Sequence, residues 1–440
     1  MDRHKSNLSR RDFIIKGAGT MAAYSMVKGT AQASPARDGN SRLVIVTNTG
    51  VLSGKKINIE VAQSMMDSGI QEFTGIADVG QAWSSLFPVL TQQTVISIKV
   101  NTLFNTSYTH PEIAQCVVNG LCRMQVEGQS FPPENIIIWD ENSGRLEDYG
   151  RYTINRSSTG VRCFGTDGQN NGQIYKIHTS NQRLSKILTD MCDYVVNLCM
   201  LKSHGMSGVS FSMKNHLGST LNAGGLHGSD SKCDPFIPAL NALEPIRSKQ
   251  KIVICDGLWG TKSGGPGGSP TDKPCKLVFG FDPVAFDYVC MQLLKDLGMP
   301  NSYINSATHI ATAAGAPYNL GTNDPAKIDV INLDTTQVDQ SGADRGLPGT
   351  FNLFQNFPNP FNAHTTFSFT VAEPSTVRIE VFNIRGERVN TLADAFYSSG
   401  YYSVHWDGTT SGGERAASGT YLCRLTAGSF NQTIKMHLIQ

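Results

Sequence analysis

The 440-residue sequence predicts two folded domains: an α/β domain with a mostly parallel sheet, followed by an all-β antiparallel sandwich. Three observations support this prediction. The chain is too long for a single hydrophobic core. From Arg42 to Leu333, short apolar runs alternate with stretches of helical periodicity, which is typical of strands joined by helices. Beyond residue 351 the apolar residues recur at every second position, as in half-buried strands.

In the α/β domain, placed at residues 42–333, apolar runs bounded by turn residues predict the strands. We expect strands at Leu43–Thr47, Val95–Val100, Asn135–Trp139, Tyr194–Leu201, Lys251–Cys255, Lys276–Gly280 and Ile328–Leu333. We expect helices at Ile59–Asp67, Pro111–Met124, Ser185–Met191, Val209–Leu217, Pro235–Ile246, Pro283–Leu297 and Tyr303–Ala314. Three of these helices begin with proline, whose missing N–H needs no partner in the first turn.

Residues 334–351 are polar and lack periodicity, which indicates a linker. In the second domain, residues 352–440, apolar residues alternate with polar ones around Phe367–Val371 and Val377–Val381. Further strands are expected at Arg388–Leu392, Tyr401–Trp406, Thr420–Leu425 and Gln432–Leu438. So many short strands in so short a stretch indicate an antiparallel sandwich.

Residues 1–34 have the composition of an export signal. The charged head contains Arg10 and Arg11 within SRRDFIIKGAG, and an Ala/Gly-rich stretch ending in the small residues Ala31–Ala33 follows. This segment resembles a twin-arginine signal peptide, which implies the twin-arginine translocase as a partner. The alternative is an ordinary basic N-terminus. The apolar stretch is too short to stay in a membrane, so we expect no transmembrane anchor in the mature chain.

The charge and cysteine content exclude several classes of protein. Residues 41–351 carry 24 Lys/Arg and 27 Asp/Glu, and residues 352–440 carry six of each. Because neither region is basic, we expect no nucleic-acid partner. The ten cysteines include no C-x-x-C pair, so we expect no iron–sulfur cluster.

Polar residues follow several predicted strands, and they suggest where a site lies. Ligands of open parallel sheets bind beyond the carboxyl ends of the strands. We therefore expect one edge of the sheet to gather Asn101, Asp140, Glu141, Lys202, His204 and Asp256. The alternative is that each of them caps a helix or shapes a turn.

The stretch Asp193–Gly228 is dense in lysine, histidine and asparagine, and it carries the predicted chemistry. We expect Lys202, His204 and Lys214 to form a catalytic cluster with His204 as general acid or base. We expect Lys99, Asn101 and Asn215 to bind the substrate. Lysine charges and amide groups suit a small anionic ligand, either a carboxylate or a phosphate. We expect the catalytic cluster at the surface, so that replacing its residues changes stability little.

A divalent metal is the open alternative for the cofactor, whose identity the sequence does not reveal. Its expected ligands are His204, Glu141 and Asp256, with His216 and His227 as further candidates. The glycine-rich loop 264–272 lacks the order of a phosphate-binding or dinucleotide-binding turn, and it is either a lid or a surface excursion. Asp282 and Asp287 flank the start of a predicted helix and are expected to cap it.

Three stretches of the α/β domain resemble a known family. VISIKVN (Val95–Asn101), VVNLCMLKSHGMSGVSFSMKNHLGS (Val195–Ser219) and FGFDPVAFDYV (Phe279–Val289) are similar, in this order, to the bacterial and archaeal family called domain of unknown function 362. The resemblance implies no particular reaction. It favours a functional role for Lys214 and Asn215. Many members of the family carry a ferredoxin-like cluster module, whose cysteine run this chain lacks.

Residues 353–440 resemble a second family. LFQNFPNPFN, VFNIRGERV, GYYSVHWDG, ASGTYLCRL and TIKMHLIQ are similar to the C-terminal sorting domain of type IX secretion substrates and to its immunoglobulin-like relatives from flagellar hook assembly. The resemblance implies an immunoglobulin-like sandwich and the type IX secretion machinery as a partner. It implies delivery through the periplasm to the outside or to the cell surface.

Two functions are compatible with the sequence. The first is an exported enzyme that acts on a small anionic substrate with the help of a cofactor or metal. The second is a non-catalytic binding protein of the surface or periplasm that holds the same kind of anion.

Overall fold

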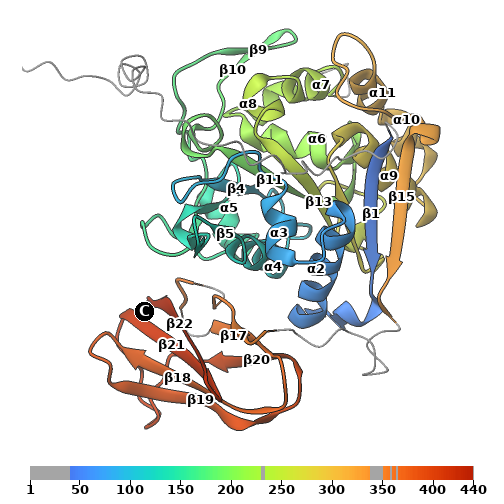
Figure 1. Cartoon of the computed structure of the whole chain (residues 1–440). Coiled ribbons are helices and arrows are strands. Elements are labelled where there is room, and N and C mark those ends of the chain that lie inside the picture. Colours follow the sequence, from blue (N-terminus) through green and yellow to red (C-terminus); the bar gives the residue numbers. More distant parts are fainter. Residues whose placement is uncertain (1–39, 229–232, 337–349, 357–358, 363–364, 440) are drawn as a thin grey trace, which may run out of the picture. The chain divides into compact units, whose positions relative to one another are not determined.

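The computed structural model describes residues 40–228, 233–336, 350–356, 359–362 and 365–439 (Figure 1). It confirms the predicted fold class, an α/β domain with a mostly parallel sheet and a sandwich of antiparallel strands. The predicted signal peptide and most of the predicted linker lie outside the described residues. None of the described helices is long and apolar enough to cross a membrane.

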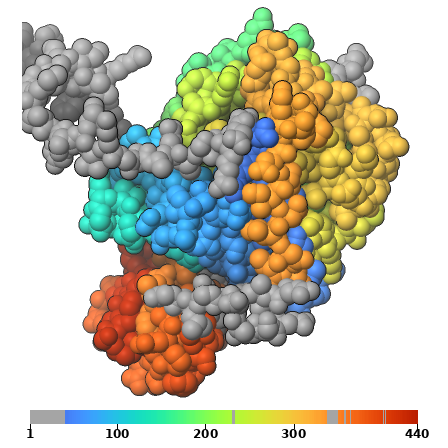
Figure 2. All heavy atoms as spheres, turned by 45° about the vertical axis from the view of Figure 1, so that its right-hand side comes forward, coloured from blue at the N-terminus to red at the C-terminus, as the bar shows by residue number. Residues whose placement is uncertain are grey.

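The α/β domain is built on a nine-stranded sheet with the order β15–β1–β14–β13–β11–β4–β7–β8, and β12 pairs with β11. The strands are β1 (Ser41–Thr47), β4 (Ile96–Lys99), β7 (Ile136–Trp139), β8 (Arg162–Cys163), β11 (Tyr194–His204), β12 (Gly208–Ser210), β13 (Gln250–Thr261), β14 (Lys276–Gly280) and β15 (Ile328–Asp334). β14 is antiparallel to β1 and β13, and β12 is antiparallel to β11, whereas the other neighbours are parallel. Figure 2 shows the edge strand β15, in orange, at the surface beside the blue β1.

Short elements complete the domain. The helices are α2 (Ile59–Thr74), α3 (Val79–Ser84), α4 (Pro111–Cys122), α5 (Ser143–Asp148), α6 (Ser212–Asn215), α7 (Phe236–Asn241), α8 (Glu244–Arg247), α9 (Pro283–Asp296), α10 (Asn301–Ser306) and α11 (His309–Ala314). Single turns form η1 (Thr49–Val51), η2 (Pro133–Asn135), η3 (Ile187–Met191), η4 (His216–Ser219), η5 (Ala223–Leu226) and η6 (Pro325–Lys327). Two-stranded ribbons join β2 (Leu52–Ser53) to β3 (Lys56–Ile57), β5 (Gln125–Val126) to β6 (Gln129–Ser130), and β9 (Tyr175–Ile177) to β10 (Ser180–Gln182).

Helices cover both faces of the sheet, and successive strand residues therefore point into two different hydrophobic clusters. Ile98 of β4 and Val117 of α4 belong to one cluster. Cys199 of β11 and Phe286 of α9 belong to the other. A strand that is buried on both faces needs apolar residues at nearly every position, which is why these strands were visible in the sequence.

Two strands extend beyond their predicted ends. β11 continues past Leu201 through Lys202 and His204, and β13 continues past Cys255 to Thr261. These strands were predicted to stop at the last residue of an apolar run. The charged residues expected beyond the strands therefore lie within them.

Three helix predictions were wrong in part. Val209 and Ser210, expected at the start of a helix, belong to β12, which pairs with β11, so that only Ser212–Asn215 is α-helical. The region predicted as Pro235–Ile246 contains the two short helices α7 and α8, and the region Tyr303–Ala314 contains the end of α10 and α11.

The second domain has two antiparallel sheets with the orders β16–β17–β20 and β19–β18–β21–β22. Its strands are β16 (Asn352–Leu353), β17 (Thr365–Val371), β18 (Ser375–Asn383), β19 (Arg388–Tyr397), β20 (Gly400–Trp406), β21 (Gly419–Ala427) and β22 (Phe430–Leu438). The predicted period of two is confirmed, because Phe367, Phe369, Val377 and Ile379 are fully buried. Together with Trp406 they belong to a hydrophobic core made of this domain's own residues.

Gly208 should be irreplaceable in the turn that returns the chain from β11 to β12. Its φ is +75°, and a Cβ there would lie 2.1 Å from the carbonyl oxygen of Tyr303 in α10. Gly168 is the matched control, since its φ is +79° and nothing lies within 4 Å of the Cβ position. We expect Gly168→Ala to cost about 1 kcal/mol of unfolding free energy from backbone strain alone. Gly208→Ala should cost about 1–3 kcal/mol more because of the clash.

Urea unfolding of the two full-length variants measures both costs. Equal losses for Gly168→Ala and Gly208→Ala would contradict the close approach of α10 to this turn.

Candidate functional site

A cavity of about 60 Å³ lies at the end of β11, against α6. A space of this size holds roughly four water molecules. It is lined by Asn101, Leu103, Asp140, Glu141, Asn142, Arg145, Lys202, His204, Ser210, Lys214, Asn215, Leu217, Gly218, Ala223, His227 and Pro266. The lining contains five of the six residues expected at the sheet edge, and Asp256 is not among them. It also contains the three predicted catalytic residues.

The expectation that the catalytic cluster lies at the surface was wrong. Lys202, His204 and Lys214 are only 1%, 5% and 6% exposed, respectively. Burying a charged or polar side chain is costly unless it finds partners. Their replacement is therefore not a surface substitution, and the expected small effect on stability loses its basis.

Lys99 lies beside the cavity and is paired with Asp140. Its Nζ donates to Asp140 Oδ1 at 2.7 Å and to the carbonyl oxygen of Val100 at 2.8 Å. The other carboxylate oxygen of Asp140 accepts from the backbone N–H and the hydroxyl of Thr102, at 2.7 and 3.0 Å. A Cβ on Gly218 would lie 2.6 Å from Asp140 Oδ1, so only glycine fits over this ion pair. Lys99 is thus a compensated charge.

A second ion pair in the lining was missed by the sequence reasoning. Arg145 donates to Glu141 Oε2 at 3.1 Å. The signal was present in the sequence, because an arginine four residues after a glutamate is a common pairing distance. This pair also compensates its own charges.

Lys202 has no carboxylate among its hydrogen-bond partners in the described chain. Its Nζ donates to Asn101 Oδ1 at 2.7 Å and to the carbonyl oxygen of Ser107 at 3.2 Å, and both acceptors are neutral. Burial lowers the pKa of Lys202 to about 7, an effect that Asp140 partly offsets and that the charges of Lys214 and Lys99 increase. Lys202 therefore exchanges its proton near neutral pH.

Lys214 is likewise held by groups that carry no negative charge at neutral pH. Its Nζ lies 3.3 Å from His227 Nε2 and 3.6 Å from Cys233 Sγ. His227 Nδ1 lies 3.0 Å from the carbonyl oxygen of Ala223, so this nitrogen carries the proton and Nε2 accepts from Lys214. Burial lowers the pKa of Lys214 and raises that of the Cys233 thiol.

His204 is fixed as a hydrogen-bond donor. Its Nδ1 accepts from the backbone N–H groups of Met206 and Ser207, at 3.2 and 3.3 Å, which leaves the proton on Nε2. Its ring stacks on His227 with 5.6 Å between the centroids. Burial above all, and then the charge of Lys214, lowers the pKa of His204 to about 2. The neutral ring can donate through Nε2, but it takes up no proton near neutral pH.

Two buried side chains position the short helix α6. Asn215 donates to the carbonyl oxygen of Lys99 at 3.2 Å and to Asn197 Oδ1 at 2.8 Å. Its own Oδ1 accepts from Asn101 Nδ2 at 3.3 Å. At the other end of α6, the carboxylate of Asp287 accepts from the backbone N–H groups of Ser212 and Met213, at 2.9 and 3.3 Å.

Asp287 therefore does not cap its own helix as the sequence reasoning expected. It lies inside α9 and accepts a hydrogen bond from the backbone N–H of Ser212, at the start of α6. Asp282 does cap α9, because its Oδ1 accepts from the backbone N–H groups of Val284 and Ala285 at 2.8 and 3.0 Å.

The predicted metal ligands are not brought together. Asp256 accepts from the backbone N–H and Nδ1 of His110, at 2.9 and 2.6 Å. Burial acts to lower the pKa of His110, but Asp256 outweighs it and the net shift is upward. His216 is likewise occupied, by Ser219 Oγ and Gln250 Oε1 at 3.0 and 2.9 Å. In the described part of the chain, no three His, Cys, Asp or Glu residues are arranged to hold a metal ion.

The structure shows a further buried histidine, His309, whose pKa burial and the charge of Lys214 influence. It was not singled out in the sequence. His309 is fully buried, and neither ring nitrogen has a hydrogen-bond partner within the described residues. Burial, followed by the charge of Lys214, lowers the pKa of His309 to about 3. Only the fold relates α11 to Lys214, so no local sequence signal was available.

The glycine-rich loop 264–272 packs along the end of β11. Gly265 N donates to Ser203 Oγ at 3.3 Å, and its carbonyl oxygen accepts from Gly205 N at 3.0 Å. Pro266 belongs to the cavity lining. The loop therefore forms part of the cavity wall.

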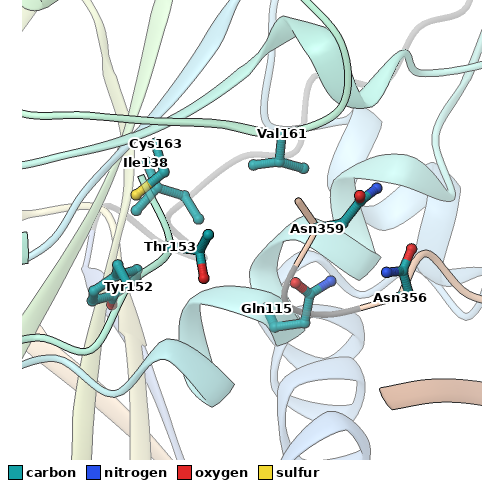
Figure 3. A pocket seen from close by; sticks show the side chains of 8 residues that line it. All are labelled: Gln115, Ile138, Tyr152, Thr153, Val161, Cys163, Asn356 and Asn359. Atoms are coloured by element: carbon teal, nitrogen blue, oxygen red, sulfur yellow. The ribbon is translucent and has the colours of Figure 1, made fainter. Parts of the chain in front are cut away.

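Figure 3 shows another group of side chains, among them six from the α/β domain. These are Gln115, Ile138, Tyr152, Thr153, Val161 and Cys163. None of the six carries a charge at neutral pH, and the hydroxyl of Tyr152 is used by the carbonyl oxygen of Thr109 at 2.9 Å. These six side chains are not suited to hold an anion, in contrast to the lysine-lined cavity.

Comparison with known families agrees with both resemblances seen in the sequence. Residues 96–292 match the family described as domain of unknown function (DUF362), and residues 359–429 match the FlgD Ig-like domain. The matches confirm the predicted relationship of the α/β domain and the immunoglobulin-like character of the C-terminal domain. Among curated proteins, none matches the chain.

Several solved structures are similar to parts of the chain. Dimeric latent PorU from Porphyromonas gingivalis is 24% identical over 19% of this chain and 9% of PorU, with a TM-score of 0.18. PorZ, a surface component of the type IX secretion system of the same organism, is 16% identical over 23% of this chain and 13% of PorZ, with a TM-score of 0.17. A Thermotoga maritima protein is 12% identical over 66% of this chain and 91% of its own, with a TM-score of 0.31. The chain thus spans about a tenth of the length of the first two.

Asp140→Asn should strongly destabilise the α/β domain. The change leaves the Lys99 ammonium buried without a counter-charge, and breaking a buried ion pair in this way costs about 3–5 kcal/mol. Adding Lys99→Met should recover part of the loss because both charges are then gone. Glu141→Gln is the control, since it breaks a partly exposed pair whose value is about 0–1 kcal/mol.

Denaturant unfolding of Asp140→Asn, Glu141→Gln and the double variant measures the loss of unfolding free energy for each. A double variant no more stable than Asp140→Asn would show that Lys99 needs no compensation.

Proposed function

We propose that the protein is an exported enzyme whose α/β domain binds a small carboxylate or phosphate anion in the lysine-lined cavity and acts on it. One observation carries this proposal. The acidic residues of the lining are both used by other cations, Asp140 by Lys99 and Glu141 by Arg145. Lys202 and Lys214 then remain without a carboxylate partner in the described chain.

An anion would offset the cost of this arrangement. A buried ammonium group is stable only when it is neutralised, either by losing its proton or by gaining a counter-charge. The pKa of Lys202, which burial lowers to about 7, expresses the first solution in the free protein. A bound carboxylate or phosphate supplies the second, and its oxygens accept hydrogen bonds from both lysines.

The residues divide the work according to their protonation. Lys202 exchanges a proton near neutral pH and is the acid or base of the site. Lys214 supplies charge, and His204 donates a hydrogen bond from Nε2, as neutral histidines do when they polarise a carbonyl group. Asn101 orients Lys202 through the 2.7 Å hydrogen bond. This assignment moves the acid–base role from His204 to Lys202. The other proposed function, a non-catalytic binding protein, uses the same contacts without turnover.

Export is supported by both ends of the sequence. SRRDFIIKGAG near the N-terminus has the paired arginines of a twin-arginine signal, and the C-terminal motifs are similar to type IX sorting domains. The FlgD Ig-like match at residues 359–429 agrees with a sorting domain of immunoglobulin-like fold. The twin-arginine translocase and the type IX secretion machinery are therefore the proposed partners, and the cell surface or the medium is the proposed destination.

Sulfate binding tests the cavity, because sulfate keeps the same charge across the neutral range. We expect its affinity to fall as pH rises through about 7, since Lys202 must be protonated to bind it. The fall should approach roughly tenfold per pH unit, as the binding-competent fraction does. Lys214→Met should weaken binding by a factor of about ten or more, the usual worth of a charged hydrogen bond.

Calorimetric titration at several pH values measures these affinities. Lys251→Met is the matched control, because Lys251 lies at the start of β13 and outside the cavity lining. Sulfate binding that is absent, or that Lys251→Met weakens as much as Lys214→Met, would refute the proposed anion site.

Replacing Arg10 and Arg11 together by lysine should leave the precursor in the cytoplasm, because the twin-arginine route requires the arginine pair. Arg3→Lys with Arg37→Lys is the matched control, as it makes the same exchange on either side of the arginine pair. Cell fractionation and immunoblotting measure the outcome. If mature protein still reaches the outside without Arg10 and Arg11, the export signal is of another kind.

A further inference from the structure

We propose that Lys202 is a covalent nucleophile that forms an imine with the carbonyl group of a small 2-oxo acid. This inference rests on the proposed anion site and narrows its substrate to an anion with a ketone or aldehyde carbon. Lys202 lines the cavity, and its two hydrogen bonds both go to neutral oxygens.

The contacts of Lys202 suit a neutral amine better than an ammonium ion. A neutral amine has two N–H bonds, which match the two acceptors, Asn101 Oδ1 at 2.7 Å and Ser107 O at 3.2 Å. The lone pair of the nitrogen is then left unused by the described protein groups. An amine needs this free lone pair to attack a carbonyl carbon.

Lys99 provides an internal contrast. Both lysines are almost fully buried in the same region, at 0% and 1% exposure. Lys99 Nζ donates to a carboxylate oxygen of Asp140 at 2.7 Å, so that its charge has a partner. Lys202 lacks such a contact, and burial together with the neighbouring lysines brings its pKa to about 7. Desolvation beside another cation is a general way to activate a lysine for imine formation.

The other side chains of the cavity meet the needs of a 2-oxo acid. Lys214 supplies a positive charge for its carboxylate. His204 presents Nε2–H as a donor for the carbonyl oxygen, since Nδ1 is occupied by the N–H groups of Met206 and Ser207. The volume of about 60 Å³, room for roughly four waters, limits the ligand to a few carbon atoms.

The chemical step balances without any further reagent. The lone pair of Lys202 Nζ forms a bond to the carbonyl carbon, and the carbonyl oxygen takes up the two hydrogens of the amine. The carbon–oxygen bond then breaks, one water molecule leaves, and a carbon–nitrogen double bond remains. Lys202 is neither oxidised nor reduced, and a proton taken up from solvent gives the iminium form, which draws electrons from the neighbouring carbon atoms.

Reductive trapping tests the inference. The full-length protein is incubated with pyruvate and cyanoborohydride between pH 6 and 8.5, and modified peptides are identified by mass spectrometry. We expect one fast-labelled site at Lys202, with a rate that rises as pH passes through about 7. Lys99 should remain unlabelled. Lys202→Arg should abolish the fast labelling, and Lys251→Met should leave it at the wild-type rate.

The results separate this inference from the proposed function. Trapping should increase with pH whereas sulfate affinity should decrease, because the nucleophile is the neutral amine and the anion site needs the ammonium ion. Pyruvate binding without a label on Lys202 would overturn the imine and leave the anion site in place. Labelling spread evenly over exposed lysines would also overturn it. If neither sulfate nor pyruvate binds, both proposals fail. The peptide map of the wild-type protein keeps the test valid even where Lys202→Arg does not fold.

Discussion

The hydrogen bonds of Asn215 determine where the cavity forms. The helix α6 is only four residues long, too short to be stable by itself. Asn215 joins its end to β4 and β11 through Lys99 O and Asn197 Oδ1, while Asp287 binds its beginning from α9. Because Lys214 directly precedes Asn215, these bonds also fix the lysine in the cavity. Without them the polar residues of α6 would be buried and unpaired, a cost that packing alone does not recover.

Burial disfavours the charged forms of Lys202 and Lys214, and this cost opposes folding. The unfolded chain keeps the pKa of Lys202 near 10.5, whereas the folded chain lowers it to about 7. Between these two pH values the unfolded state binds more protons, so the contribution of Lys202 to folding stability rises with pH. Below about 7 the full cost of burying its charge is present. The proposed anion would remove part of this cost, so that ligand binding and stability would be linked through the same side chain.

The sequence predicted whatever depends on local pattern. The strands β4 and β7 lie within a residue or two of their predicted positions, because a doubly buried strand must be apolar throughout. The ends of β11 and β13 were missed, since Lys202 and Asp256 are charged residues that interrupt the apolar pattern of a strand. They are accommodated in strands by Asn101 and His110, far away in sequence. The helix predicted over Val209–Leu217 was also wrong at its start because of a tertiary contact, the pairing of β12 with β11. His309 had no local signal at all.

The choice of the proton-exchanging residue shows why such long-range effects matter for function. From the sequence we expected His204 in this role, because a free histidine titrates closest to neutral pH. In the folded protein, burial and the neighbouring positive charges disfavour the charged forms of both His204 and Lys202. The pKa of His204 falls from the ordinary 6.5 to about 2, so that its ring does not titrate near neutral pH. The pKa of Lys202 falls from the ordinary 10.5 to about 7, which is within the neutral range. In a buried cavity rich in cations, a lysine can therefore have the near-neutral pKa that a histidine has in water.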